Sequence, residues 1–67
     1  MKIVNEAGLP FKVIGEVIDQ IIETNYGDTI YYGKVEVSYF EYKKQKYKLQ
    51  IRYMKRFIEW WFSDCEE

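Results

Sequence analysis

The spacing of apolar residues changes once along this chain, and that change limits the folds that the chain can adopt. Over residues 14–22 the apolar residues recur every three to four positions, as on one face of a helix. Over residues 34–53 they alternate with polar residues instead, as in half-buried strands. We therefore predict an α+β fold, in which one amphipathic helix packs on a small antiparallel sheet built as a hairpin or a meander.

The predicted helix spans residues 10–24. Pro10 suits the first turn of a helix, because its missing N–H would have no intrahelical partner there. Asn25 and Gly27 supply a stop signal at the other end. The apolar face of this helix consists of Ile14, Val17, Ile18, Ile21 and Ile22. Before the helix, the stretch MKIV at residues 1–4 predicts a short strand.

Strict alternation predicts two further strands, KVEVSY at residues 34–39 and YKLQIRY at residues 47–53. The stretch KKQK at residues 43–46 is a polar turn without glycine, so we expect a loop built on a type I turn between the two strands. The stretch DTIYYG at residues 28–33 predicts one more strand.

Burial selects between two registers for this hairpin. Pairing Tyr39 with Ile51 unites the apolar residues of both strands on one face, whereas a shift of one residue sends one set to the opposite face. We therefore expect Tyr39 to lie opposite Ile51. The other face then carries Phe40 and Tyr42 beside Lys48.

The C-terminal residues 55–63 fit two structures. Helical spacing is present in Met54, Phe57, Ile58, Trp61 and Phe62. A last strand fits as well, because periodicity over so few residues does not distinguish the two. We favour a short C-terminal helix. In either structure the adjacent side chains of Trp60 and Trp61 point in different directions, so one joins the core and the other faces outward.

The length of 67 residues allows one domain, covering residues 1–67. A core of this size is marginal, because folding buries only about 60% of the unfolded surface. Cys65 is the single cysteine and histidine is absent, so neither an intrachain disulfide nor a common zinc site can stabilise the fold. We therefore expect a homodimer. Its expected self-association residues are the aromatic tail, Trp60, Trp61 and Phe62.

The net charge of −1 conceals an uneven distribution. Residues 1–33 carry a charge of −3, residues 34–56 carry +6, and residues 57–67 carry −4. In the basic middle, cations alternate with aromatic residues, and such a surface can bind an acidic protein patch or a single-stranded nucleic acid. The expected partner-binding residues are Phe40, Tyr42, Lys43, Lys44, Lys46, Lys48 and Arg52.

Catalysis is not expected. Without histidine the chain lacks the side chain best suited to proton transfer near neutral pH, and its four glycines are too scattered for a phosphate-binding loop. We expect neither a cofactor nor a metal. The expected function is that of a non-catalytic binding protein that occupies the surface of a partner protein with an acidic patch. Single-stranded nucleic-acid binding is the alternative.

Residue usage and the termini bear on the source and the compartment. The chain is rich in Ile, Lys and Tyr and poor in Ala, which is typical of AT-rich coding and favours a phage or prophage accessory protein that modulates or inhibits a host protein. No apolar run approaches the roughly 18 residues of a membrane span, and residues 1–10 lack the apolar core of a secretory signal. A lone cysteine fits a reducing compartment. We therefore expect a cytoplasmic protein without a membrane partner.

Overall fold

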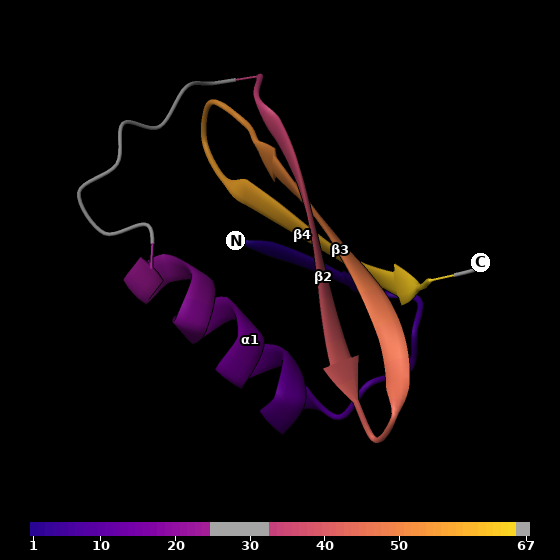
Figure 1. Cartoon of the computed structure of the whole chain (residues 1–67). Coiled ribbons are helices and arrows are strands. Elements are labelled where there is room, and N and C mark those ends of the chain that lie inside the picture. The colour runs from indigo at the N-terminus through magenta and orange to yellow at the C-terminus, as the bar shows by residue number, and fades with distance from the viewer. Residues whose placement is uncertain (25–32, 66–67) are drawn as a thin grey trace.

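The computed structural model describes residues 1–24 and 33–65 (Figure 1). In chain order these residues form the strand β1 (Lys2–Asn5), the helix α1 (Phe11–Thr24) and the strands β2 (Val35–Tyr42), β3 (Gln45–Tyr53) and β4 (Ile58–Asp64). The strands form one sheet in the order β1-β4-β3-β2, and α1 lies on one side of it (Figure 1). The expected α+β class is confirmed.

The sheet is mixed, so the expectation of an antiparallel sheet is wrong. β1 pairs with β4 in parallel, whereas β2 with β3 and β3 with β4 are antiparallel. The helix explains the difference. Because α1 connects β1 to β2 at the opposite edge of the sheet, the chain returns to its starting end before β2 begins, and β1 and β2 run in the same direction.

The C-terminal segment forms strand β4, so the expected short helix is wrong. Its residues alternate: Ile58, Trp60 and Phe62 point toward α1, and Glu59, Trp61 and Ser63 point away from it. The backbone explains why a strand forms here. β4 lies between β1 and β3, so its N–H and C=O groups find partners on both sides. A helix at this place would leave the facing backbone groups of β1 and β3 without partners.

The predicted helix is confirmed, with its first residue at Phe11. The carbonyl of Pro10 accepts hydrogen bonds from the N–H groups of Val13 and Ile14 at 3.0 and 3.1 Å, which starts the first turn. Ile14 and Ile18 are buried against the sheet, as their spacing predicts. The predicted stop signal at residues 25–27 lies outside the described residues, as does most of the strand predicted from DTIYYG.

The turn between β2 and β3 differs from the expected type I loop. Tyr42 pairs with Gln45, so the turn has only two central residues, Lys43 and Lys44. Their φ angles of 50° and 64° are both positive, as a type I′ turn requires. This turn matches the right-handed twist of the two strands, which outweighs the strain of two non-glycine residues with positive φ.

The expected register is therefore wrong as well. Tyr39 lies opposite Lys48 rather than Ile51, and the side of β2 that faces α1 carries Glu36, Ser38, Phe40 and Tyr42. Side-chain contacts explain this register. The ring of Phe40 stacks on Tyr47 with centroids 5.7 Å apart and meets Phe62 edge-on at 6.0 Å. These aromatic contacts stabilise the register in which Phe40 faces the core, and the alternation of residue types along β2 does not indicate that register.

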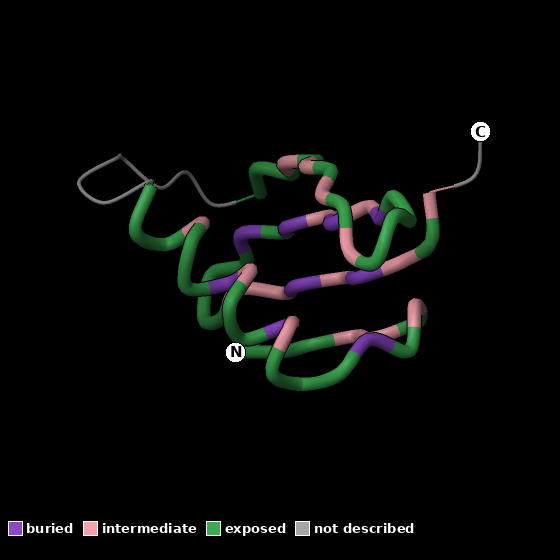
Figure 2. The backbone as a smooth tube through the Cα atoms, turned by 60° about the horizontal axis from the view of Figure 1, so that its bottom comes forward, coloured by how far each residue is buried: buried purple, intermediate pink, exposed green. Residues whose placement is uncertain are grey.

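The hydrophobic core lies between α1 and the sheet. Figure 2 shows buried and less buried residues alternating along the strands, as expected for a sheet that is covered on one face only. The buried core residues are Leu9, Ile14, Ile18, Tyr47, Leu49, Ile51, Tyr53, Trp60 and Phe62. In the described parts of the chain, no helix is long and apolar enough to cross a membrane.

Candidate functional site: the outer face of the sheet

The side of the sheet opposite α1 carries no second layer of described residues (Figure 1). We call it the outer face. The strand registers assign to it Lys2 and Val4 of β1, Glu59, Trp61 and Ser63 of β4, Lys46, Lys48, Gln50 and Arg52 of β3, and Val35, Val37, Tyr39 and Glu41 of β2. None of these residues is buried. The outer face is thus the largest uncovered surface that the sheet offers.

Three of the four residues in the middle row of the outer face are apolar. Val37, Gln50, Trp61 and Val4 lie in one row across the four strands, one residue from each. Tyr39 lies beside this row on β2, with 54% of its surface exposed, and Val37 is 49% exposed. Large apolar residues at this exposure are available to contact another molecule.

Two cations lie over the rings of this face. The Cζ atom of Arg52 is 5.5 Å from the centroid of Trp61, and the Nζ atom of Lys46 is 5.2 Å from the centroid of Tyr39. In both cases the cation is the diagonal cross-strand neighbour of the ring, at a distance that suits a cation–π contact. The register therefore orders the cationic side chains over the rings before any partner binds.

Charge is uneven along the outer face. At one end the Nζ atom of Lys2 lies 3.6 Å from the carboxylate of Glu59. At the hairpin end, Lys46 faces Glu41, whereas Lys48 lies between the uncharged residues Tyr39 and Ser63. Lys43 and Lys44 add two more positive charges at the turn. The hairpin end of this face is consequently the basic end.

The structure separates the residues that were expected to bind a partner. Lys46, Lys48 and Arg52 lie on the outer face, and Lys43 and Lys44 form the turn.

Phe40 and Tyr42 point the other way and pack against the core. The rings beside the cations are instead Tyr39 and Trp61, of which the sequence assigned Tyr39 to the core. The alternation did group Tyr39 with Val35 and Val37, because these three residues share one side of β2 in either register. Alternation shows which residues share a face, but not which face is covered.

The aromatic tail is divided in the same way. Trp60 and Phe62 are buried in the core, with 2% and 0% of their surfaces exposed, so their rings fill the interior of this chain. Trp61 faces outward under Arg52. The prediction that one tryptophan joins the core and the other faces outward is confirmed.

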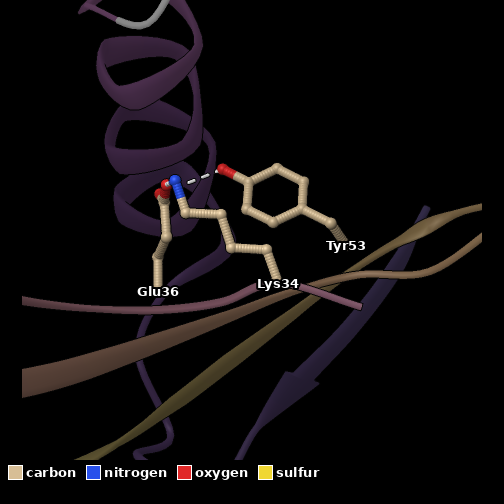
Figure 3. A network of polar contacts seen from close by, with 3 residues as sticks. All are labelled: Lys34, Glu36 and Tyr53. Atoms are coloured by element: carbon tan, nitrogen blue, oxygen red, sulfur yellow. Dashed lines mark hydrogen bonds and ion pairs between the residues drawn. The ribbon is translucent and has the colours of Figure 1, made fainter. Parts of the chain in front are cut away.

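A polar cluster lies on the opposite side of the sheet, close to α1 (Figure 3). The carboxylate of Glu36 accepts a hydrogen bond from the Tyr53 hydroxyl at 3.0 Å and lies 2.8 Å from the Nζ atom of Lys34. The ammonium of Lys34 is the main reason that the pKa of Glu36 is below its ordinary value, and the Tyr53 hydroxyl lowers it further against the opposing effect of partial burial. This cluster gives a partner to a carboxylate on the inner side of β2.

A groove of about 630 Å³ separates α1 from β2. Val17, Ile21 and Thr24 line it from the helix, and Ser38 and Phe40 line it from the strand. Its lining is mixed, because Lys34 and Glu36 of the polar cluster also border it. Among residues 1–24 and 33–65, no three Cys, Asp or Glu side chains come together in a group that could hold a metal ion.

Comparison of the chain with protein-family models finds no match, and comparisons with curated proteins and with solved structures find none either. The geometry of the outer face is therefore the basis on which a function can be inferred.

Proposed function

We propose that this chain is a non-catalytic binding protein whose outer face contacts an acidic surface of a partner protein. The observation that carries the proposal is the uncovered apolar row through Val37 and Trp61, with Lys46, Lys48 and Arg52 beside it. Apolar contact supplies the affinity of such an interface, and complementary charge supplies orientation and rate of association. The protein then acts by occupying the surface of its partner. The AT-rich residue usage supports a phage or prophage source, in which case the partner is a host protein.

The cations over the rings favour a protein partner over a nucleic acid. Base stacking needs a free ring face, and Arg52 and Lys46 each lie over a ring of the outer face. A carboxylate on a partner can pair with either cation where it stands, because an Arg or Lys over a ring keeps N–H donors pointing outward. An acidic protein surface therefore needs less rearrangement of this face than a base does.

The test is a titration of isotope-labelled protein, followed residue by residue through the backbone amide signals. One probe is a synthetic peptide of alternating Glu and Phe residues, and the other is a single-stranded oligothymidylate. We expect the peptide to shift the amides of Val37, Tyr39, Lys48 and Trp61. The double substitution Lys48→Glu with Arg52→Glu should weaken peptide binding by at least about tenfold, because two attractive charges become repulsive.

The matched control is Lys12→Glu, which reverses the charge of an exposed lysine on α1, away from the outer face. It should leave peptide affinity within about twofold of the original. Shifts confined to α1, or equal losses from Lys12→Glu and from the outer-face variant, would contradict the proposal.

Single-stranded nucleic-acid binding is the second candidate, supported by the presence of Tyr39 and Trp61 among the cations of the outer face. Binding of oligothymidylate in preference to the peptide, with an affinity that falls steeply with salt, would replace the first proposal with this one. Tyr39→Ala and Trp61→Ala should then each weaken binding, because each removes a ring on which a base stacks.

A further inference from the structure

The two edges of the sheet differ in how they are protected. Among the described residues, β1 forms one edge and is only four residues long, whereas β2 forms the other and is eight residues long. β2 contains neither proline nor glycine. A long edge strand of this kind exposes a row of unpaired backbone groups to other strands, and folded proteins usually shorten, bend or charge such an edge.

The hairpin turn determines which backbone groups of β2 face the free edge. A two-residue turn makes Tyr42 and Gln45 a hydrogen-bonded pair, and such pairs then recur at every second residue. At the far end of the hairpin, the N–H of Tyr53 donates to the carbonyl of Lys34 at 3.0 Å. Lys34, like Tyr42, is even-numbered, so this bond follows the same alternation. The even-numbered residues of β2 therefore bond to β3. The N–H and C=O groups of the odd-numbered residues point to the free edge, and these residues are Val35, Val37, Tyr39 and Glu41.

The side chains of the same residues are mainly apolar and half exposed. Val35, Val37 and Tyr39 have 50%, 49% and 54% of their surfaces exposed. The charge on the inner side of β2 is already engaged, because Glu36 is held by Lys34 and Tyr53. The edge of β2 thus combines backbone groups that no other described strand pairs with and side chains that are β-branched or aromatic, which are the residue types that pair best across strands.

We propose that β2 pairs antiparallel with β2 of a second copy of this chain, about a two-fold axis at Ser38. In this register Val37 lies opposite Tyr39 of the second copy, and this favourable pairing of a β-branched with an aromatic residue occurs twice. The four edge-facing residues of each copy then form about eight hydrogen bonds. Glu41 faces Val35 and Glu36 faces Phe40, so no like charges oppose each other. A parallel pairing in register would instead place each of these glutamates opposite its own copy.

The parity of the edge also determines the shape of the dimer. Residues that exchange hydrogen bonds across an antiparallel pair carry their side chains on the same side of the sheet. The two outer faces therefore join into one continuous surface, and both copies of α1 lie on the other side. Among the described residues, the groove separates α1 from β2, so the helix does not cover this edge.

A second copy suits this edge better than an unrelated strand for two reasons. The edge is self-complementary in charge and side-chain pairing, as the register shows. In addition, the core of one copy holds only nine buried residues in the described chain, and a core this small gains from burying a further strand edge. Pairing at the free edge does not depend on what the outer face binds.

The experiment is sedimentation equilibrium of the full chain over a dilution series, without any partner. We expect a reversible change between 8.2 kDa and twice that mass. Val37→Pro should raise the dissociation constant of the dimer by at least about tenfold, because it removes an N–H that faces the edge and spares the bonds to β3. Val37→Lys should do the same by charge, and it decides the question if the proline variant fails to fold.

The matched control is Gln50→Lys, which places the same charge in the same row, one strand away from the edge. It should leave the dissociation constant unchanged within about twofold. In a mixed sample of labelled and unlabelled chains, an intermolecular contact between Val37 methyls and the Tyr39 ring is expected by isotope-filtered NMR. A chain that stays monomeric at every concentration would overturn the proposal. A dimer insensitive to both Val37 variants, or one with contacts through Trp61, would overturn it too.

Discussion

The two faces of the sheet are built from the same strands and differ in what covers them. On β3, Leu49 and Ile51 are almost fully buried beneath α1. Lys48, Gln50 and Arg52 alternate with them along the strand and lie on the outer face. On β2 the usual distribution of residues is inverted over residues 35–39. Its inner side includes Glu36 and Ser38, and its outer side carries Val35, Val37 and Tyr39. Apolar content alone therefore does not define the core of this protein, and the strand that departs from the rule is the longer of the two edge strands.

The largest expected effect is a difference in the free energy of unfolding between substitutions at two adjacent residues, one on each face. Leu49→Ala should lower the free energy of unfolding by about 2–5 kcal/mol, because it leaves a cavity at a side chain that is 0% exposed. That is a large share of the roughly 5–15 kcal/mol that stabilise a typical domain. Gln50→Ala on the outer face should change the same free energy by less than about 1 kcal/mol.

Urea unfolding, followed by the fluorescence of the two tryptophans, measures both variants. Similar losses for Leu49→Ala and Gln50→Ala would mean that the outer face is packed in the isolated chain, against the structure.

The second prediction concerns the turn that sets the register, and with it the two faces. Lys43→Asn combined with Lys44→Gly should raise the free energy of unfolding by about 1 kcal/mol, because the new residues adopt positive φ with less strain. The control is Lys55→Asn with Arg56→Gly in the turn between β3 and β4. It removes the same charge from a turn whose described residues have no positive φ, so it should give no gain. Thermal unfolding of both double variants, followed by circular dichroism, compares them. An equal gain in both would point to charge rather than backbone strain.

The smallest predicted effect concerns the polar cluster on the inner side of β2. Since folding lowers the pKa of Glu36, this carboxylate stabilises the fold at pH values above its unfolded pKa. That contribution is lost as the pH falls through the lower pKa of the folded state. Glu36→Gln should therefore be less stable than the original chain at pH 7, and the difference should shrink at pH 3. Urea midpoints at the two pH values measure it.

Lys34→Met provides the control for Glu36. Because Lys34 is the main cause of the lowered pKa, most of the pH-dependent effect of Glu36→Gln should disappear in the Lys34→Met background. An effect that persists undiminished without Lys34 would assign the pH dependence to another group.

Much of the fold was predictable because its signals are local. The spacing of Ile14 and Ile18 predicted α1, and alternation predicted β2 and β3. The two adjacent tryptophans were also predicted to separate, because neighbours on any regular element diverge. The tail was misassigned because Met54, Phe57, Ile58, Trp61 and Phe62 have helical spacing by coincidence. In β4 the residues that face the core are Ile58, Trp60 and Phe62, which follow the alternation of a strand.

The candidate site was predictable in its charges and not in its rings. Lys46, Lys48 and Arg52 were expected at the surface and lie there, because a long cation rarely enters a core. The faces predicted for Phe40 and Tyr39 are the reverse of those that the structure shows. The face assigned to each ring depended on the register of the hairpin. The register depends on the two-residue turn, and two lysines are not residues that indicate such a turn.

Patterns among neighbouring residues were enough to specify one amphipathic helix, two alternating strands and the basic character of the hairpin. Packing between distant elements set which side of the sheet α1 covers, how β1 and β4 pair, and which strands form the edges. The physical reason is that hydrophobic burial and backbone pairing depend on contacts between residues far apart in the chain. Those contacts turned Val35, Val37 and Tyr39 of β2 outward, and these residues belong to the surface on which both proposals rest.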